Sequence, residues 1–136
     1  VMIEVELKNI IIDEKRQDQV IVLKEKKGKR QFPIIIGYIE ASSIKMKIAG
    51  VKPPRPLTHD LLLSLMKGLD AKLEYLFIDK MIDGTFHAKL KIKTKEDQEK
   101  FIDTRPSDGI ALAVRAGASI FVEEKVLEKA MLFKME

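Results

Sequence analysis

Two runs on either side of Asp83-Gly84 constrain the fold most, because they predict a β-hairpin in the middle of the chain. Residues 85–95 alternate between apolar and mostly basic side chains, and this period of two is that of a strand with one buried face. Asp-Gly is a favoured two-residue hairpin turn, so we expect the strand to fold back on residues 72–82. Such a hairpin needs a larger sheet or a helix layer against which to bury its apolar face.

A two-residue turn at Asp83-Gly84 also fixes a pairing register that can be checked. The pairs expected on the apolar face are Tyr75–Ile92, Phe77–Leu90 and Met81–Phe86, and those on the other face are Glu74–Lys93 and Ile78–Lys89. Only Asp79, opposite Ala88, interrupts the apolar face.

The rest of the sequence predicts an α+β domain. Further strands are expected at residues 3–12, 20–23, 32–36 and 120–122, and helices at residues 38–49, 57–69, 106–116 and 123–133. The expected buried helix positions are Ala41, Ile44 and Ile48, then the stripe Leu61, Leu62, Leu65 and Leu69, and finally Val126, Leu127, Ala130 and Met131. We therefore predict a single compact domain over residues 1–136, with a largely antiparallel or mixed sheet and about four helices.

The composition excludes several classes of protein. With 46% hydrophobic residues the chain is too apolar to be disordered, yet it has no apolar run of the roughly 20 residues that a membrane helix needs. No signal peptide is evident, and the absence of cysteine excludes disulfides and thiolate catalysis and suits a cytoplasmic location. The high Lys and Glu content, with a single asparagine, resembles that of heat-adapted proteins.

The positive charge is concentrated in two places. One is the basic turn around Gly28, which is expected to be a solvated hairpin tip. The other is the lysine row, Lys89, Lys91 and Lys93, which repeats about every 6.8 Å along an extended strand. Such a row can follow a phosphate backbone, or it can protect an edge strand from pairing with other molecules.

The first of two polar clusters is PRPLTHDL, residues 54–61. Thr58 is suited to N-cap the helix that follows, which would place His59 and Asp60 in an exposed first turn. A histidine there can act as general base, general acid or metal ligand, and the neighbouring carboxylate can bind a cation. Simple helix capping explains the same residues without a function.

The second polar cluster is DTRPSDGIALAVRAGASIFV, residues 103–122. Pro106 fits the first helical position, which places Ser107 and Asp108 in the first turn and Arg115 on the same helix face as Asp108. Partners for these charges are expected from Arg105 or Asp103. The cluster is either a structural ion-pair network or a site in which Asp103 and Asp108 hold a metal and the arginines bind phosphate. Because helix N-termini attract anions, the two clusters are candidates for one composite site.

Glu40 is a third acidic candidate. It lies in IGYIEASSI, residues 36–44, one helical turn before Ile44 and therefore toward the expected buried side. A buried carboxylate needs a cation or hydrogen-bond donors, so an arginine from either cluster or a metal is its expected partner.

The order of these three segments closely resembles the bifunctional nuclease domain family, whose characterised bacterial members are described as degrading both DNA and RNA. The resemblance covers roughly residues 1–130 and implies a compact α+β domain. Gly109 departs from the alanine expected at its position, a change that should tighten packing without affecting chemistry. The family's polar residues correspond by position to Glu40, Arg55, Thr58, His59, Asp60, Arg105, Ser107, Asp108 and Arg115.

The resemblance implies a nuclease that hydrolyses phosphodiester bonds of DNA and RNA without sequence specificity. The catalytic candidates are His59, Asp60, Asp108 and Glu40, with Asp60 and Asp108 as ligands of Mg²⁺ or another divalent cation and with no organic cofactor. The substrate-binding candidates are Arg55, Thr58, Arg105, Ser107 and Arg115, together with Lys89, Lys91 and Lys93. The alternative is a non-catalytic module that binds a nucleotide or phosphate and forms a homo-oligomer.

Overall fold

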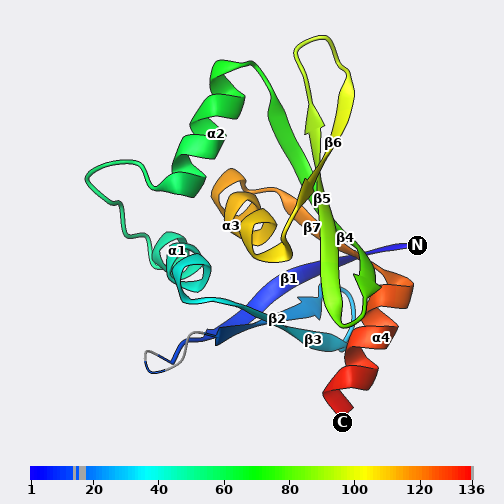
Figure 1. The fold of residues 1–136 in the computed structure, drawn as a ribbon. Helices are drawn as coiled ribbons and strands as arrows, with labels where there is room; N and C mark the ends of the chain where they lie inside the picture. Colours follow the sequence, from blue (N-terminus) through cyan, green and yellow to red (C-terminus); the bar gives the residue numbers. More distant parts are fainter. Residues whose placement is uncertain (14, 16–17, 136) are drawn as a thin grey trace.

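Seven strands form one mixed sheet (Figure 1). The computed structural model describes residues 1–13, 15 and 18–135 and orders the strands β3-β2-β1-β7-β4-β5-β6. The strands are β1 (Met2–Ile11), β2 (Asp18–Glu25), β3 (Gln31–Gly37), β4 (Lys72–Ile82), β5 (Thr85–Lys93), β6 (Glu99–Thr104) and β7 (Ser119–Glu123). Neighbouring strands are antiparallel except for β4 and β7, which run parallel.

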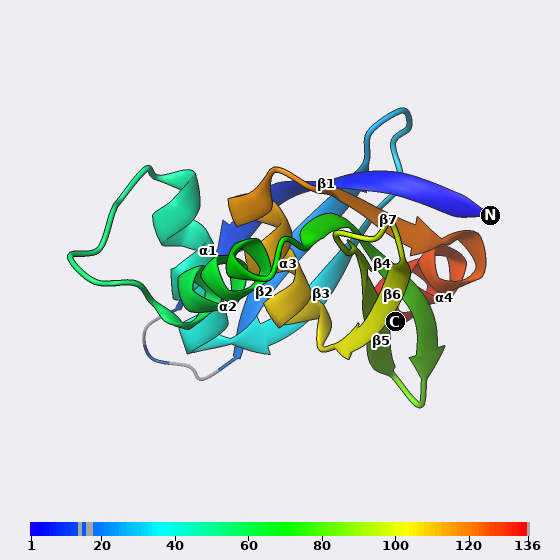
Figure 2. The same ribbon diagram turned by 90° about the horizontal axis from the view of Figure 1, so that it is seen from above.

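Four helices accompany the sheet within the described residues, which confirms the predicted single α+β domain. They are α1 (Tyr38–Ile48), α2 (Thr58–Gly68), α3 (Pro106–Ala116) and α4 (Glu124–Met135). Helices α1, α2 and α3 lie together on one side of the molecule, and α4 lies at the other end, beside the C-terminus (Figures 1 and 2). In the described part of the chain, no helix has both the length and the apolar character needed to cross a membrane.

The sheet is strongly curled. Four strands separate β3 from β5 in the sheet order, yet the rings of Phe32 and Phe86 have their centroids 5.8 Å apart. The apolar side chains of the strands, including Ile21 and Leu76, form one core with buried residues of α3 and α4 such as Ile110 and Leu127. Burying each such side chain stabilises the fold by about 1.5–3 kcal/mol, so the curled sheet and these helices depend on one another.

The β4–β5 hairpin forms at the predicted turn, but the predicted register is wrong beyond its first pairs. Met81 faces Phe86 as expected, whereas β-bulges at Asp79 and Glu74 shift the later pairs. The observed pairs include Ile78–Ala88, Phe77–Lys89, Leu76–Leu90, Tyr75–Lys91 and Lys72–Lys93. Each bulge places an acidic residue outside the ladder, so Leu76 and Ile78 face the core in place of Tyr75 and Phe77.

Strand β6 was not predicted, and it overturns one interpretation of the lysine row. Because β6 pairs with β5 along residues 99–104, β5 lies inside the sheet and is not an edge strand. All but the last residue of β6 are exposed, including Phe101 and Ile102, so the strand lacks the alternation of a half-buried strand. The position of β6 is set by its pairing with β5, and no local pattern of apolar residues predicts it.

Helix α2 is turned the opposite way from the prediction. Leu61, Leu62, Leu65 and Leu69 are exposed, and the side facing the protein carries His59, Leu63 and Met66 instead. Ile48 at the end of α1 is exposed as well.

The N-cap of α2 is Leu57 and not the predicted Thr58. The helix begins at Thr58, which is exposed, and the N–H of the preceding Leu57 donates to the Asp60 carboxylate at 3.0 Å.

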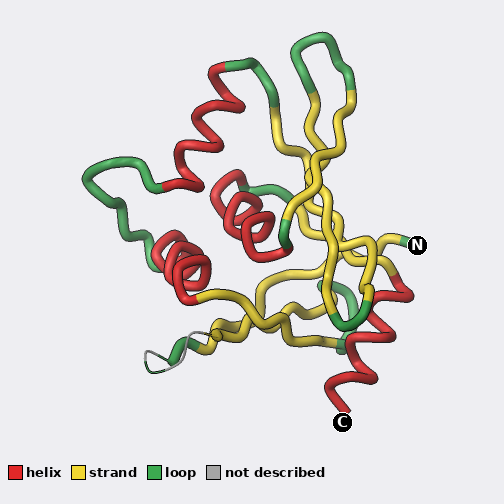
Figure 3. The backbone as a smooth tube through the Cα atoms, viewed as in Figure 1, coloured by secondary structure: helices red, strands yellow, loops and turns green. Residues whose placement is uncertain are grey.

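Helix α3 has the predicted bounds and packs closely against β4. It begins at Pro106 and ends at Gly117, whose φ of 68° is the left-handed conformation favoured by glycine at a helix end. A β-carbon on Gly109 would lie 2.5 Å from Leu76 Cδ1. The missing side chain therefore lets the start of α3 approach the sheet, while α1 and α2 pack on its other side (Figure 3).

Candidate functional site

His59 is at the centre of a polar network that joins three helices. Its ring is only 6% exposed, so the prediction of an exposed histidine was wrong. Nε2 lies 3.0 Å from Asp108 Oδ1 on α3, and Nδ1 lies 2.9 Å from Ser43 Oγ on α1. In the neutral ring, Nε2–H donates to the carboxylate and the Ser43 hydroxyl donates to Nδ1. Both ring nitrogens are thus satisfied within the protein.

Arg105 connects the same network to the surface. Its Nε donates to Asp108 Oδ2 at 2.9 Å and its Nη2 to Glu40 Oε1 at 3.1 Å, while the side chain remains 69% exposed. Burial raises the pKa of the Asp108 carboxyl, but hydrogen bonds from His59 and Arg105 outweigh burial and hold this pKa below its ordinary value. Asp108 is therefore an ionised carboxylate at neutral pH, held between an imidazole and a guanidinium.

Arg115 forms the buried half of the network. Its side chain is 5% exposed and donates to Asp60 Oδ1 at 2.9 Å and to the carbonyl oxygens of Ala111 and Ser43, each at 3.2 Å. The Leu57 N–H is the largest cause that lowers the pKa of the Asp60 carboxyl, and Arg115 lowers it further against the effect of burial. This guanidinium therefore connects α1, α2 and α3, and its predicted contact with phosphate stays a prediction.

The structure brings six of the predicted residues into one network. We call it the three-helix network, and its members are Glu40, Ser43, His59, Asp60, Arg105, Asp108 and Arg115. Arg105 is the predicted partner of Asp108 and of Glu40, whereas Asp60, and not Asp103, is the partner of Arg115. Ser43 was missed, although its spacing of three from Glu40 places both on one side of α1.

Four other candidates lie outside the network. Arg55 and Thr58 are exposed, and Asp103 is exposed on β6. None of these three has a side-chain hydrogen bond or ion pair with any network residue in residues 1–13, 15 and 18–135. Ser107 is 7% exposed in the first turn of α3, beside Asp108, and borders a cavity.

The lysine row lies on the other face of the sheet. Lys89, Lys91 and Lys93 alternate along β5 with the buried Ala88 and Leu90, which face the core side where α3 packs. Each lysine is also paired with acid, in the ion pairs Lys89–Asp79, Lys91–Glu74, Lys91–Glu99 and Lys93–Asp97 at 3.0–3.6 Å. Its predicted contact with nucleic acid stays a prediction, and the row is not continuous with the three-helix network.

The carboxylates of the network do not fit a preformed cation site. Asp60 is bound to Arg115, and both Asp108 and Glu40 are bound to Arg105, so an arginine would have to leave before a metal could bind. Across the described residues, no three acidic or histidine side chains are grouped so as to hold a metal ion. Metal binding by Asp60 and Asp108 stays a prediction.

The exposed end of the network suits an oxyanion. Arg105 immediately precedes α3, and the first N–H that donates along this helix is that of Gly109, to the Arg105 carbonyl at 3.0 Å. The N–H groups of Ser107 and Asp108 therefore lack a helical acceptor, and they lie at the positive end of the helix dipole beside a guanidinium. Such an arrangement can bind a phosphate oxygen.

Comparison with known proteins identifies the family. The model of the bifunctional nuclease domain matches residues 21–134, and the chain belongs to this family. Uncharacterised proteins from two strains of Mycobacterium tuberculosis are each 40% identical to the chain over 129 residues, which is 95% of this chain and 76% of theirs. These matches confirm the predicted resemblance.

Proposed function

We propose that the protein is a nuclease that hydrolyses phosphodiester bonds of DNA and RNA at the start of α3. The observation that carries the proposal is the exposed Arg105, held by Asp108, which is itself bonded to the buried His59. The exposed Arg105 guanidinium provides a contact for phosphate. The Asp108 carboxylate beside it, bonded to the His59 imidazole, provides a proton acceptor. Membership of the bifunctional nuclease domain family supports the same activity.

The proposed reaction uses three groups. Arg105 and the N–H groups of Ser107 and Asp108 bind the phosphate oxygens and stabilise the charge that grows on them. A water oxygen bonds to phosphorus while Asp108 accepts the water proton, the bond from phosphorus to the leaving sugar oxygen breaks, and that oxygen takes a proton from solvent. His59 is a positioning residue, because it orients Asp108 and is too buried to touch the substrate.

Asp60, Arg115 and Glu40 support this site without contacting the substrate. Asp60 and Arg115 fix α2 against α3, and Glu40 holds the Arg105 guanidinium from α1. The sequence predicted catalytic roles for Asp60 and Glu40 and phosphate binding for Arg115. We propose these supporting roles for the three residues instead. Arg105 and the helix N–H groups carry the charge stabilisation in this reaction, and cleavage assays measure its dependence on Mg²⁺.

A non-catalytic module that binds phosphate or nucleotide is the second candidate. The observation that favours it is the saturation of the network, in which both nitrogens of His59 and all three carboxylates already have partners inside the protein. A network of this kind can hold three helices in place and present Arg105 as a binding group only. The two candidates share the phosphate contact and differ in turnover.

Cleavage assays with matched variants separate the two candidates. Highly purified protein is incubated with single- and double-stranded DNA and RNA in Mg²⁺, Mn²⁺ or EDTA, beside Asp108→Asn and Arg105→Ala. The control is Asp70→Asn, a substitution of an exposed aspartate outside the network. We expect about 10²-fold slower cleavage for both site variants and no change for the control.

Each other outcome has a definite meaning. Cleavage that persists equally in all variants places the activity elsewhere or in a contaminant and overturns the proposed site. Binding without cleavage by any sample, lost in Arg105→Ala, establishes the binding module instead. Activity in EDTA contradicts the predicted divalent cation at Asp60 and Asp108, and activity only in Mg²⁺ or Mn²⁺ supports it.

A further inference from the structure

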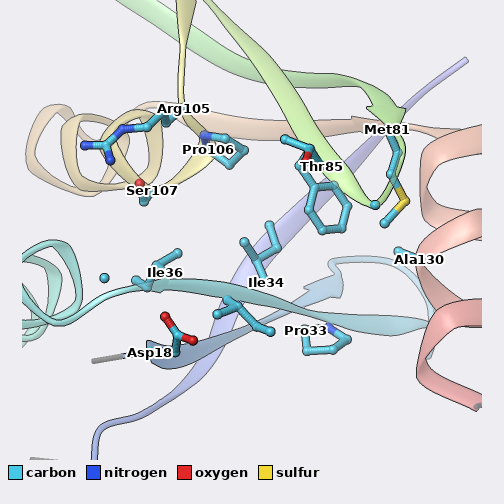
Figure 4. A pocket seen from close by; sticks show the side chains of 14 residues that line it. Asp18, Pro33, Ile34, Ile36, Met81, Thr85, Arg105, Pro106, Ser107 and Ala130 are labelled. Atoms are coloured by element: carbon cyan, nitrogen blue, oxygen red, sulfur yellow. The ribbon is translucent and has the colours of Figure 1, made fainter. Parts of the chain in front are cut away.

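A cavity of about 590 Å³ opens beside the start of α3. Its walls come from β3, from the β4–β5 turn and from the first residues of α3, with Ala130 of α4 at one end (Figure 4). This volume lies within the roughly 300–1,000 Å³ typical of small-molecule sites. The curl of the sheet creates the cavity, because it brings β3 near the β4–β5 turn without pairing them.

One wall of the cavity is polar. Arg105 and Ser107 border it, and only 7% of the surface of Ser107 is exposed. In the described part of the chain no side chain or carbonyl forms a hydrogen bond with the Ser107 hydroxyl. Because Ser107 borders the cavity and its hydroxyl forms no hydrogen bond with the described residues, that hydroxyl can donate to or accept from a polar ligand at the start of α3.

The charges around this wall limit the ligand to a weakly charged anion. Arg105 faces two carboxylates, Asp108 and Glu40, so the positive charge is already more than balanced by negative charge. Arg105 Nη1 nevertheless has no partner among the described residues, so it can donate to a ligand. The two carboxylates repel a dianion more strongly than a singly charged oxyanion, so of the two this wall favours the singly charged one.

The remaining walls suit a flat, partly apolar group. Ile34, Met81 and Phe86 line the cavity, and the ring of Phe86 is fixed against Phe32. Asp18 lies on the β2–β3 side, across from Arg105 and Ser107 (Figure 4). A nucleobase can pack against the apolar side chains while its N–H groups donate to the Asp18 carboxylate.

We propose that the cavity is a nucleobase subsite that holds one unstacked base next to a phosphodiester bound by Arg105 and Ser107. A phosphodiester carries one negative charge, the lower charge that the polar wall favours, and the cavity volume is in the range of small-molecule sites. This inference rests on the proposed function for the nature of the substrate. It adds that the protein takes a base out of its stack and therefore favours single strands over duplexes.

The direct test is binding, measured without turnover. In EDTA, the dinucleotide adenylyl-adenosine is titrated into ¹⁵N-labelled protein and followed by amide NMR shifts, beside the same sugar-phosphate diester without bases. We expect shifts at Ser107, Asp108 and Phe86 and at least 10-fold weaker binding of the diester without bases. Equal affinity for the two probes, or shifts confined to other surfaces, would overturn the proposal.

Two variants address the two ends of the cavity. Ser107→Ala removes the unpartnered hydroxyl and should weaken binding of the dinucleotide about 5- to 10-fold, the effect of one hydrogen bond. Thr85→Trp places a large ring at the exposed mouth and should abolish the preference for the probe with bases. Ser64→Ala, an exposed serine on α2, is the matched control and should bind as the unchanged protein does. An unchanged preference in Thr85→Trp would contradict the subsite.

Cleavage assays keep this inference separate from the proposed function. If oligonucleotides with and without a base at the cleaved position are cut equally, the proposed nuclease activity is supported and the proposed nucleobase subsite is overturned. If the dinucleotide binds as expected and no substrate is cut, the nucleobase subsite is supported and the proposed nuclease activity is overturned.

Discussion

The lysine row and the arginines of the three-helix network are both concentrations of positive charge, yet their surroundings differ. Each lysine of the row forms an ion pair with an acidic residue on β4, on β6 or in the turn between β5 and β6. Each of these ion pairs is partly exposed to solvent. Arg105 and Arg115 instead reach carboxylates more than fifty residues away in sequence. A regular charge pattern therefore marks a local surface here, whereas the candidate site is made by long-range contacts.

Arg115→Ala should have the largest effect on stability. The substitution removes the guanidinium that donates to Asp60 Oδ1 and to the Ser43 carbonyl, and breaking a buried ion pair typically costs about 3 kcal/mol. We expect a loss of this size in the free energy of unfolding, measured by urea denaturation. Lys93→Ala, at an exposed ion pair of the row, should change it by less than about 0.5 kcal/mol. Equal effects of the two would remove the contrast between the regions.

His59→Ala should have the next largest effect, of about 2 kcal/mol. It removes a buried ring and leaves Ser43 Oγ and Asp108 Oδ1 without their partner on α2, while Asp108 Oδ2 keeps Arg105. A double-mutant cycle with Ser43→Ala should give a coupling energy of about 1 kcal/mol, because the two side chains are in direct contact. Additive effects would show that the Ser43–His59 hydrogen bond does not contribute to stability.

Acid should weaken the three-helix network by protonating the Asp60 and Asp108 carboxylates. The pKa values of Asp60 and Asp108 are below their ordinary values in the folded protein, so in this range the unfolded chain binds more protons. The stability they contribute is present above the unfolded pKa of about 3.9 and is lost as the pH falls through the lower folded values. We expect denaturation midpoints to fall with pH below about 4, and to fall less in Asp108→Asn. A variant with the same pH dependence would contradict this assignment.

The salt dependence of nucleic-acid binding should change least and can sharpen the comparison further. If Arg105 contacts one phosphate, Arg105→Ala should reduce the slope of log affinity against log salt by about 0.9. A variant with Gln at Lys89, Lys91 and Lys93 tests the predicted contact of the row, and fluorescence anisotropy measures both. An unchanged slope in the lysine variant would overturn that contact, while a reduced slope would establish a second binding surface on the other face of the sheet.

Helix α3 could be predicted almost completely because its signals are local. Pro106 sets its start, Gly117 sets its end, and Asp108 meets Arg105 three residues earlier. Helix α2 shows the opposite case. Its leucine spacing correctly predicts an amphipathic helix but not which face is buried, because that face is chosen by its partners. Here Ser43 and Asp108 draw the His59 face inward, and the leucine stripe remains outside.

The register of β4 and β5 failed for a similar reason. The turn at Asp83-Gly84 fixes only the pairs next to it, and each bulge then shifts the register by one residue. The bulges occur at Asp79 and Glu74, where continued pairing would have placed a carboxylate or the wrong aromatic residue toward the core. Strand β6 has no apolar alternation at all, so only its partner strand defines it.

The sequence by itself determined the family, the α+β class and six members of the three-helix network, because motifs, periodicity and helix-end signals act over a few residues. Only the tertiary structure decided that His59 is buried, that Asp60 and not Asp103 binds Arg115, and that the lysine row lies on the other face from Arg105. Those outcomes depend on which elements pack together, and that choice is made by the total burial of apolar surface and the pairing of buried charges across the whole chain.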